Sequence, residues 1–317
     1  MCHMLAQANG RAWRPAGVLV TVDGTAYPGC PGPPIPGQSG FSSQIAYELM
    51  RASDGLWLSE CVAYAAATYP MGPSIQEGVA NALARINGGT DSFGTAYPGY
   101  PVGTPILGSG YSQGAIVWNT LYLREFLDPA GSCHNRFTNG DLKRIYLFGD
   151  PCRTPGLAYG TLAAGLPMPP KTDGEVTGGI AGPGDPEAKV IGCLTPEQTR
   201  MPSPYDQQPI VWSFVNKGDM YGDCPVGLDP YTSATEAKPG RVETGIFNII
   251  MHATFMNLLS IARDFFTPIS TVEAIFNAGK FFLAGMNSPH YTYWSSVPAA
   301  VSDALAIGKH LPSFPPA

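Results

Sequence analysis

Short apolar runs along the chain predict the strands of a buried sheet. Residues 17–22 (GVLVTV), 142–148 (LKRIYLF) and 210–215 (IVWSFV) are rich in β-branched and aromatic side chains, and turn-forming or polar residues follow each run. Continuous apolar runs of this length are typical of strands that are buried on both faces of a parallel sheet. Another strand ends at 105–107, whereas the pattern at 57–64 does not distinguish helix from strand.

Longer segments with a helical repeat of apolar positions lie between these runs. The pattern predicts helices at 42–50, 74–86, 115–126 and 297–307. Strands that alternate with helices predict an α/β fold with a mostly parallel central sheet flanked by helices. A length of 317 residues is compatible with one such domain, so we predict a single domain over residues 1–317.

An apolar stretch near the C-terminus allows two interpretations. Segments 243–266 and 272–283 are mostly apolar, but polar side chains such as His252 and Arg263 interrupt the first of them. A membrane-spanning helix needs about 20 predominantly apolar residues, which these interruptions do not leave. We therefore predict a helical insertion within the domain, over 228–286, and no transmembrane segment.

Composition narrows the possible functions. Only 13% of the residues are charged and the formal net charge is −6, so no basic surface is expected to bind nucleic acid. The N-terminus has no apolar core of a signal peptide. Seven cysteines without C-x-x-C spacing do not predict a metal site, and we expect no cofactor. If the protein works outside a cell, Cys193 and Cys224 are the pair that we expect to form a disulfide.

The main chemical signal is the sequence GYSQG at residues 110–114. A G-x-S-x-G motif between a strand and a helix is typical of a nucleophile elbow, in which the chain turns sharply and presents the serine hydroxyl. Glycines two residues before and after the serine leave room for that turn. The chain contains 38 glycines, so the motif alone is weak, but a predicted strand and helix flank it as required. Ser112 is therefore the predicted nucleophile.

A serine nucleophile needs a histidine as general base. Of the five histidines, His290 lies in a loop after all the predicted strands, where α/β hydrolases place their base. His134 lies in a polar loop and His252 within an apolar helix, and both remain alternatives.

The base in turn needs a carboxylate, which should follow the carboxyl end of a strand. Asp150 and Asp219 both fulfil this condition, with Asp223 as a third candidate. We favour Asp219 because Ser112, Asp219 and His290 then follow successive structural units, in the chain order nucleophile, acid, base.

Several blocks of sequence resemble the lysin B family, the mycolylarabinogalactan esterases of mycobacteriophages, which are relatives of the cutinases among the α/β hydrolases. These blocks are VTVDGT (20–25), YPMGPSIQEGVANALARI (69–86), GYSQGAIV (110–117), LKRIYLFGDP (142–151), GDMY (218–221) and PHY (289–291).

The resemblance implies the same triad: Ser112, the aspartate of GDMY (Asp219) and the histidine of PHY (His290). It also implies an oxyanion hole formed by the backbone N–H groups of Gln113 and Thr25, and a helical linker between the acid and the base. No metal or organic cofactor is implied.

The function that the resemblance implies is hydrolysis of the ester bond between mycolic acids and arabinogalactan during phage lysis. The protein would then be made in the host cytoplasm and act on the host envelope after release, in peripheral contact with its lipid-rich outer layer. A general lipase or cutinase-like carboxylesterase with the same triad is an alternative. A non-catalytic cell-wall-binding protein with a vestigial elbow is the second alternative.

Overall fold

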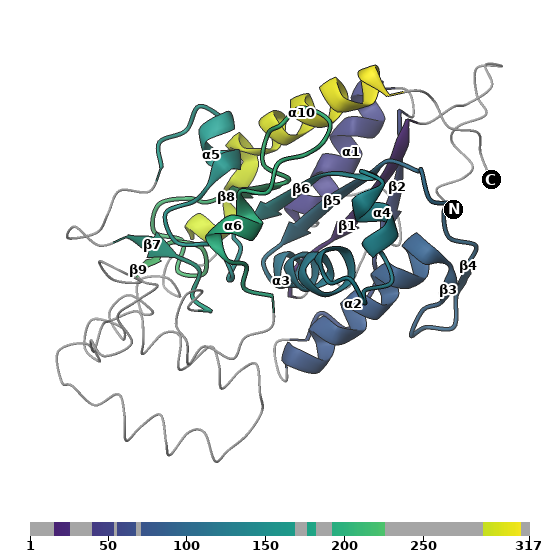
Figure 1. Ribbon diagram of the computed structural model, residues 1–317. Coiled ribbons are helices and arrows are strands. Elements are labelled where there is room, and N and C mark those ends of the chain that lie inside the picture. Colours follow the sequence, from purple (N-terminus) through teal and green to yellow (C-terminus); the bar gives the residue numbers. More distant parts are fainter. Residues whose placement is uncertain are drawn as a thin grey trace, which may run out of the picture.

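A five-stranded parallel sheet forms the centre of the computed structural model (Figure 1). The structure describes residues 16–25, 40–53, 56–67, 71–168, 176–181, 192–225 and 288–311. The strand order is β2-β1-β5-β6-β8, and every neighbouring pair is parallel. These strands are β1 (Gly17–Val22), β2 (Trp57–Cys61), β5 (Ile106–Tyr111), β6 (Leu142–Phe148) and β8 (Val211–Phe214).

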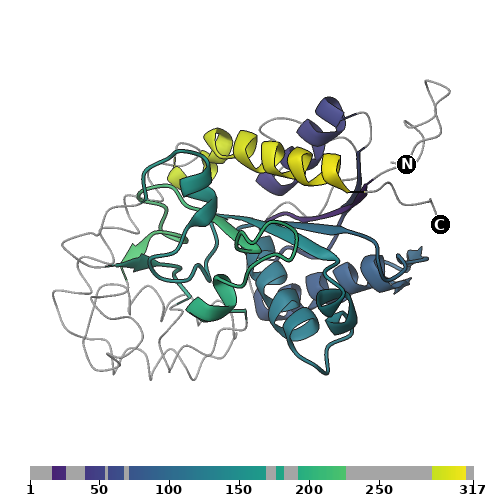
Figure 2. The same cartoon turned by 45° about the horizontal axis from the view of Figure 1, so that its top comes forward.

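Helices cover both faces of the sheet (Figures 1 and 2). Helices α1 (Phe41–Ser53) and α10 (Val297–His310) cover one face, and α2 (Met71–Asn87) and α3 (Gln113–Leu121) cover the other. Alternate residues of β1 point to opposite faces, so Leu19 packs with α1 and α10 while its neighbours in the strand pack with α2 and α3. Because both faces are buried, the strands are continuously apolar in sequence.

Shorter elements connect or extend this core. They are two antiparallel pairs, β3 (Gly89–Thr90) with β4 (Ala96–Tyr97) and β7 (Thr177–Gly178) with β9 (Cys224–Pro225), a π-helix Tyr122–Leu127, helices α4 (His134–Thr138), α5 (Tyr159–Ala163) and α6 (Pro196–Thr199), and the 3-10 helices η4 (Pro289–Tyr291) and η5 (Tyr293–Ser295).

The parallel arrangement places the carboxyl ends of the strands at one edge of the sheet. β5 lies between β1 and β6, so Ser112 at its end is next to Asp23 and Gly149, which follow those strands. The last strand, β8, leads to the loop that contains Asp219. In open α/β sheets, ligands bind at this edge.

The predicted α/β fold with a parallel central sheet is confirmed. Segment 57–64, which the pattern left undecided, begins with the edge strand β2. The predicted helix 115–126 continues as an α-helix only to Leu121, and a π-helix follows. The insertion predicted at 228–286 lies outside the described residues and stays a prediction. In the described part of the chain, no helix combines the length and apolar character needed to span a membrane.

The predicted disulfide between Cys193 and Cys224 is wrong, because Cys193 is not part of a disulfide bond. Its thiol hydrogen-bonds Cys152, which is buried just beyond the end of β6. Cys224 instead lies in β9 and pairs through its backbone with β7. Sequence spacing alone does not reveal which cysteines lie side by side.

Candidate active site

Ser112 lies at the sharp turn between β5 and α3. Its backbone has φ 54° and ψ −119°, a conformation that is uncommon for residues other than glycine. A Cβ atom at Gly110 would lie 2.6 Å from the carbonyl oxygen of Gly114, and one at Gly114 would lie 2.0 Å from that of Val22. The two glycines of the motif are therefore required for the close approach of β1, β5 and α3.

His290 is held beside this serine. Its Nε2 atom lies 2.9 Å from Ser112 Oγ, although 178 residues separate the two in sequence. The ring of Tyr111 stacks on the imidazole at a centroid distance of 5.1 Å, and the Tyr111 hydroxyl donates a hydrogen bond to the His290 carbonyl oxygen. Ser288 Oγ accepts a hydrogen bond from the backbone N–H of His290. The packing and these bonds hold both the ring and its backbone.

Asp219 lies on the opposite side of the imidazole. His290 Nδ1 is 3.0 Å from each Asp219 carboxylate oxygen. The Tyr293 hydroxyl donates to Oδ2 at 2.5 Å and the Tyr221 backbone N–H donates to Oδ1 at 3.0 Å. Burial alone would raise the pKa of Asp219, but the charge and hydrogen bond of His290 and the other two donors lower the pKa below its usual value. The site thus stabilises an ionised carboxylate.

The alternative acids have other partners. Both oxygens of Asp150 accept hydrogen bonds from the Asn119 side chain, and one also accepts from the Cys152 backbone. Burial raises the pKa of Asp150 to about 6. Asp223 accepts from the Gly218 backbone N–H.

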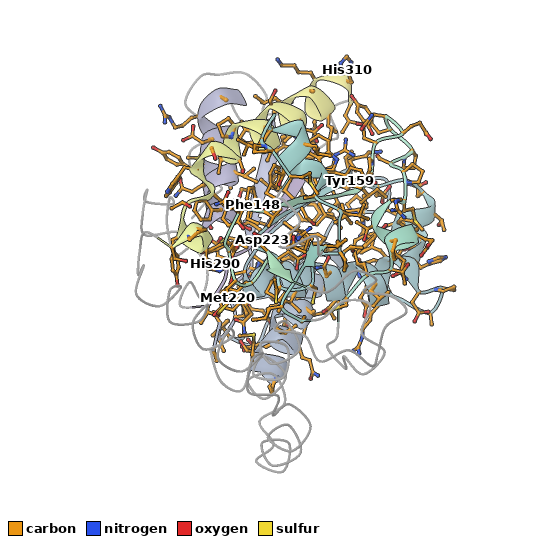
Figure 3. All side chains as sticks on the ribbon, turned by 90° about the vertical axis from the view of Figure 1, so that its left-hand side faces the viewer. Phe148, Tyr159, Met220, Asp223, His290 and His310 are labelled. Atoms are coloured by element: carbon orange, nitrogen blue, oxygen red, sulfur yellow. The ribbon has the colours of Figure 1, made fainter. Side chains whose placement is uncertain are left out.

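The alternative base His134 contacts a backbone carbonyl oxygen and not the serine. His134 Nδ1 lies 3.0 Å from the carbonyl oxygen of Phe126, near the end of the π-helix. His252 lies outside the described residues. In the view of Figure 3, His290 lies well away from His310, the last residue of α10.

The two segments that carry the predicted oxyanion donors border Ser112 from different sides. Gln113 is the first residue of α3, so its backbone N–H has no acceptor within the helix, and the helix N-terminus carries a partial positive charge. On the other side, a Cβ atom at Gly24 would lie 2.7 Å from Ser112 Cβ. The turn that contains Thr25 therefore runs directly past the serine.

Sequence reasoning did not identify Tyr293 as part of this site. The residue is fully buried, and its hydroxyl contacts Asp219 across 74 positions of sequence. The available signal was the aromatic segment YTYW that follows His290. Such a segment does not reveal which of its hydroxyl groups turns inward.

Comparisons with known proteins support the predicted resemblance. No protein-family model matches the chain. The chain is 31% identical to endolysin B of Mycobacterium phage D29 and 30% identical to endolysin B of Mycobacterium phage L5, in each case over 141 residues, or 44% of this chain and 48% of the relative. The aligned part therefore spans about half the length of these curated relatives.

A solved structure shows the same fold over more of the chain. The crystal structure of lysin B from mycobacteriophage D29 matches 92% of this chain and 99% of its own, with a TM-score of 0.51 and 22% sequence identity. Together with the sequence matches, this result confirms the predicted similarity to lysin B.

Proposed function

We propose that the protein is a serine esterase with Ser112 as nucleophile, His290 as general base and Asp219 as the acid of the triad. The observation that carries this proposal is the continuous row of contacts from Asp219 through His290 to Ser112, at 3.0 and 2.9 Å. Nucleophile, base and orienting carboxylate within hydrogen-bonding distance are the signature of an activated serine.

In this mechanism His290 Nε2 accepts the hydroxyl proton as Ser112 Oγ attacks the ester carbonyl carbon. The backbone N–H groups of Gln113 and Thr25 stabilise the negative oxygen of the tetrahedral intermediate. His290 then donates the proton to the leaving alcohol, and an acyl-enzyme remains. A water molecule, deprotonated by the same imidazole, releases the acid. Asp219 stabilises the imidazolium in both half-reactions.

The proposed substrate is the ester that joins mycolic acids to arabinogalactan in the mycobacterial envelope. Support comes from the sequence similarity to endolysin B of two mycobacterial phages. The protein would then be made in the host cytoplasm and reach the envelope during lysis. A general cutinase-like carboxylesterase would use the same triad on simpler esters. The ordered triad argues against the alternative of a non-catalytic wall-binding protein.

The first test is the variant Ser112→Ala, measured with p-nitrophenyl butyrate. Without the nucleophile, kcat should fall by about a thousandfold or more, because the acyl-enzyme cannot form. Ser109→Ala is the matched control: Ser109 lies on the same strand, is buried, and hydrogen-bonds Ser42. Unchanged turnover in Ser112→Ala would disprove the esterase proposal.

The substrate requires a separate assay. Wild-type protein and Ser112→Ala are incubated with purified mycolyl-arabinogalactan and with tributyrin, and the free acids are quantified. We expect release of free mycolate by the wild-type protein only. Hydrolysis of tributyrin without release of mycolate would favour the general carboxylesterase.

A further inference from the structure

A buried tyrosine outside the triad connects the two segments that border Ser112. Tyr64 follows β2 and is fully buried. Its hydroxyl has one proton to donate and lies 2.6 Å from the Asp23 carbonyl oxygen and 3.1 Å from Gln113 Oε1, so these two acceptors share the proton. Asp23 directly precedes the turn of Thr25, and Gln113 directly follows the serine.

Both contacted residues are anchored on their far sides. The Asp23 carboxylate accepts hydrogen bonds from the backbone N–H groups of Ser42 and Ser43 at the start of α1, and from the Ser43 hydroxyl. The Gln113 side chain donates to the Ala67 carbonyl oxygen at 3.0 Å. The Tyr64 hydroxyl is thus a central connection in a buried polar network. Such a network can hold its members in one arrangement.

The Tyr64 hydroxyl remains protonated throughout the range in which esterases work. Burial, with smaller contributions from the charges of Asp23 and Glu77, raises its pKa well above 10. The ring is also fixed, since Gly78 of α2 lies so close that a Cβ atom there would be 3.2 Å from the Tyr64 ring. A fixed ring with a permanent donor is suited to set the distance between two backbone segments.

We propose that Tyr64 is a positioning residue for the oxyanion hole: its hydroxyl fixes the Asp23–Thr25 segment relative to Gln113, and so sets the separation of the two N–H donors. The inference rests on the proposed esterase function. It assigns a role to a residue that touches neither the triad nor the substrate.

The consequence is a specific kinetic signature. An oxyanion hole stabilises the transition state more than the bound ester, so a change in its geometry should lower kcat and leave KM almost unchanged. For Tyr64→Phe, which removes only the hydroxyl, we expect kcat to fall by about 10- to 100-fold, less than the loss caused by deletion of a donor. Affinity for a trifluoromethyl ketone, with which the serine forms a tetrahedral oxyanion, should fall in parallel.

The control is Tyr146→Phe. Tyr146 is also fully buried, and its hydroxyl donates to Asp303 Oδ2 at 2.8 Å on the α10 side of the sheet. This variant loses a comparable hydrogen bond but should keep wild-type kcat and inhibitor affinity. Wild-type kcat in Tyr64→Phe, or a change confined to KM, would overturn the proposal.

A double-mutant cycle keeps the test decisive if Tyr64→Phe folds less well. Gln113→Met removes the other end of the contact with Tyr64 and should lower kcat by a smaller factor. The fold-loss in kcat of the double variant should be smaller than the product of the fold-losses of the two single variants, because both changes disrupt the same connection. Independent, multiplicative losses would contradict the proposal. Activity that persists in Ser112→Ala would instead contradict the esterase function, so the two failures are distinguishable.

Discussion

The carboxylate of Asp219 is held by three donors from two loops. His290 and Tyr293 belong to the loop before α10, and the Tyr221 N–H belongs to the loop of the aspartate itself. Tyr293 also accepts a hydrogen bond from the Asn216 backbone N–H. Its ring packs edge-on against Phe41. One tyrosine therefore joins the loop that carries the acid to the loop that carries the base.

Replacing Tyr293 with Phe should make the protein more sensitive to acid. The folded-state pKa of Asp219 is lowered, so this residue contributes stability that is present above its unfolded pKa and is lost as the pH falls through the folded value. Loss of the Tyr293 donor raises the folded-state pKa, so the variant should unfold at a higher pH than the wild-type protein. We also expect kcat to fall by about tenfold, because Asp219 is held less firmly.

Circular dichroism during acid titration measures this midpoint. Tyr100→Phe provides the control, since the Tyr100 hydroxyl contacts Glu60, a residue of the edge strand β2. An acid midpoint equal to that of the wild-type protein, with unchanged kcat, would refute a role of Tyr293 in holding Asp219.

At the scale of elements, α10 is joined to the sheet by a buried charge. The guanidinium of Arg144 on β6 is fully buried, and its Nε donates to Asp303 Oδ2 on α10 at 2.9 Å. Asp206 provides a second carboxylate, and the Tyr146 hydroxyl also donates to Asp303. This attachment fixes α10 against β6.

Asp303→Asn should destabilise the protein without changing its chemistry. Removing one partner of a buried pair leaves a charge that is poorly compensated, and we expect a loss of about 2–3 kcal/mol in the free energy of unfolding, since Asp303 is partly exposed. Urea denaturation at pH 7 measures the loss. Glu48→Gln, which breaks an exposed ion pair with Arg51 on α1, should cost less than about 0.5 kcal/mol. Equal losses in the two variants would contradict the argument.

The same elements explain which parts of the fold could be predicted. Strand β6 has the predicted bounds 142–148, because a strand covered on both faces is continuously apolar. β2 remained undecided because it is an edge strand with half-buried Ser59 and Glu60, so its sequence carries a weaker signal. The switch to a π-helix after Leu121 has no periodic signature over so few residues.

For the candidate site, a local motif predicted the nucleophile and chain order predicted its two partners. Ser112 follows from a contiguous motif, and Asp219 and His290 follow from their places after strands; the structure brings all three together. Tyr64 could not be predicted because its role depends on a contact with Gln113 across 49 positions. A tyrosine after an edge strand has no sequence feature that distinguishes it from ordinary core.

At the scale of the whole molecule, two carboxylates are buried at the edge of the sheet where the strands end. Asp23 follows β1 and Asp150 follows β6, on either side of the strand that leads to Ser112. Burial raises the pKa of each to about 6, although hydrogen bonds from Ser43 and from Asn119 partly offset the effect of burial. Both groups are therefore ionised at neutral pH at a cost to the folded state.

This cost predicts the sign of a pH effect on stability. The pKa of each carboxyl group is 3.8 in the unfolded chain and about 6 in the folded protein. Between these two pH values, the folded protein binds more protons at the two sites than the unfolded chain does. Their contribution to stability therefore falls as the pH rises through this window. Each residue contributes at most about 3 kcal/mol to the change. This change of stability with pH is opposite in sign to the change caused by Asp219, whose contribution to stability is lost only at lower pH.

Urea denaturation of the wild-type protein and of Asp150→Asn at intervals from pH 4.5 to 7.5 tests this sign. Asparagine cannot ionise, so the wild-type protein should lose stability relative to the variant as the pH rises through about 6. Whatever hydrogen bonding the amide disturbs around Asn119 is the same at every pH, so only the slope of the difference is diagnostic. A difference in unfolding free energy that stays constant, or that changes in favour of the wild-type protein with rising pH, would show that Asp150 is not buried at a cost.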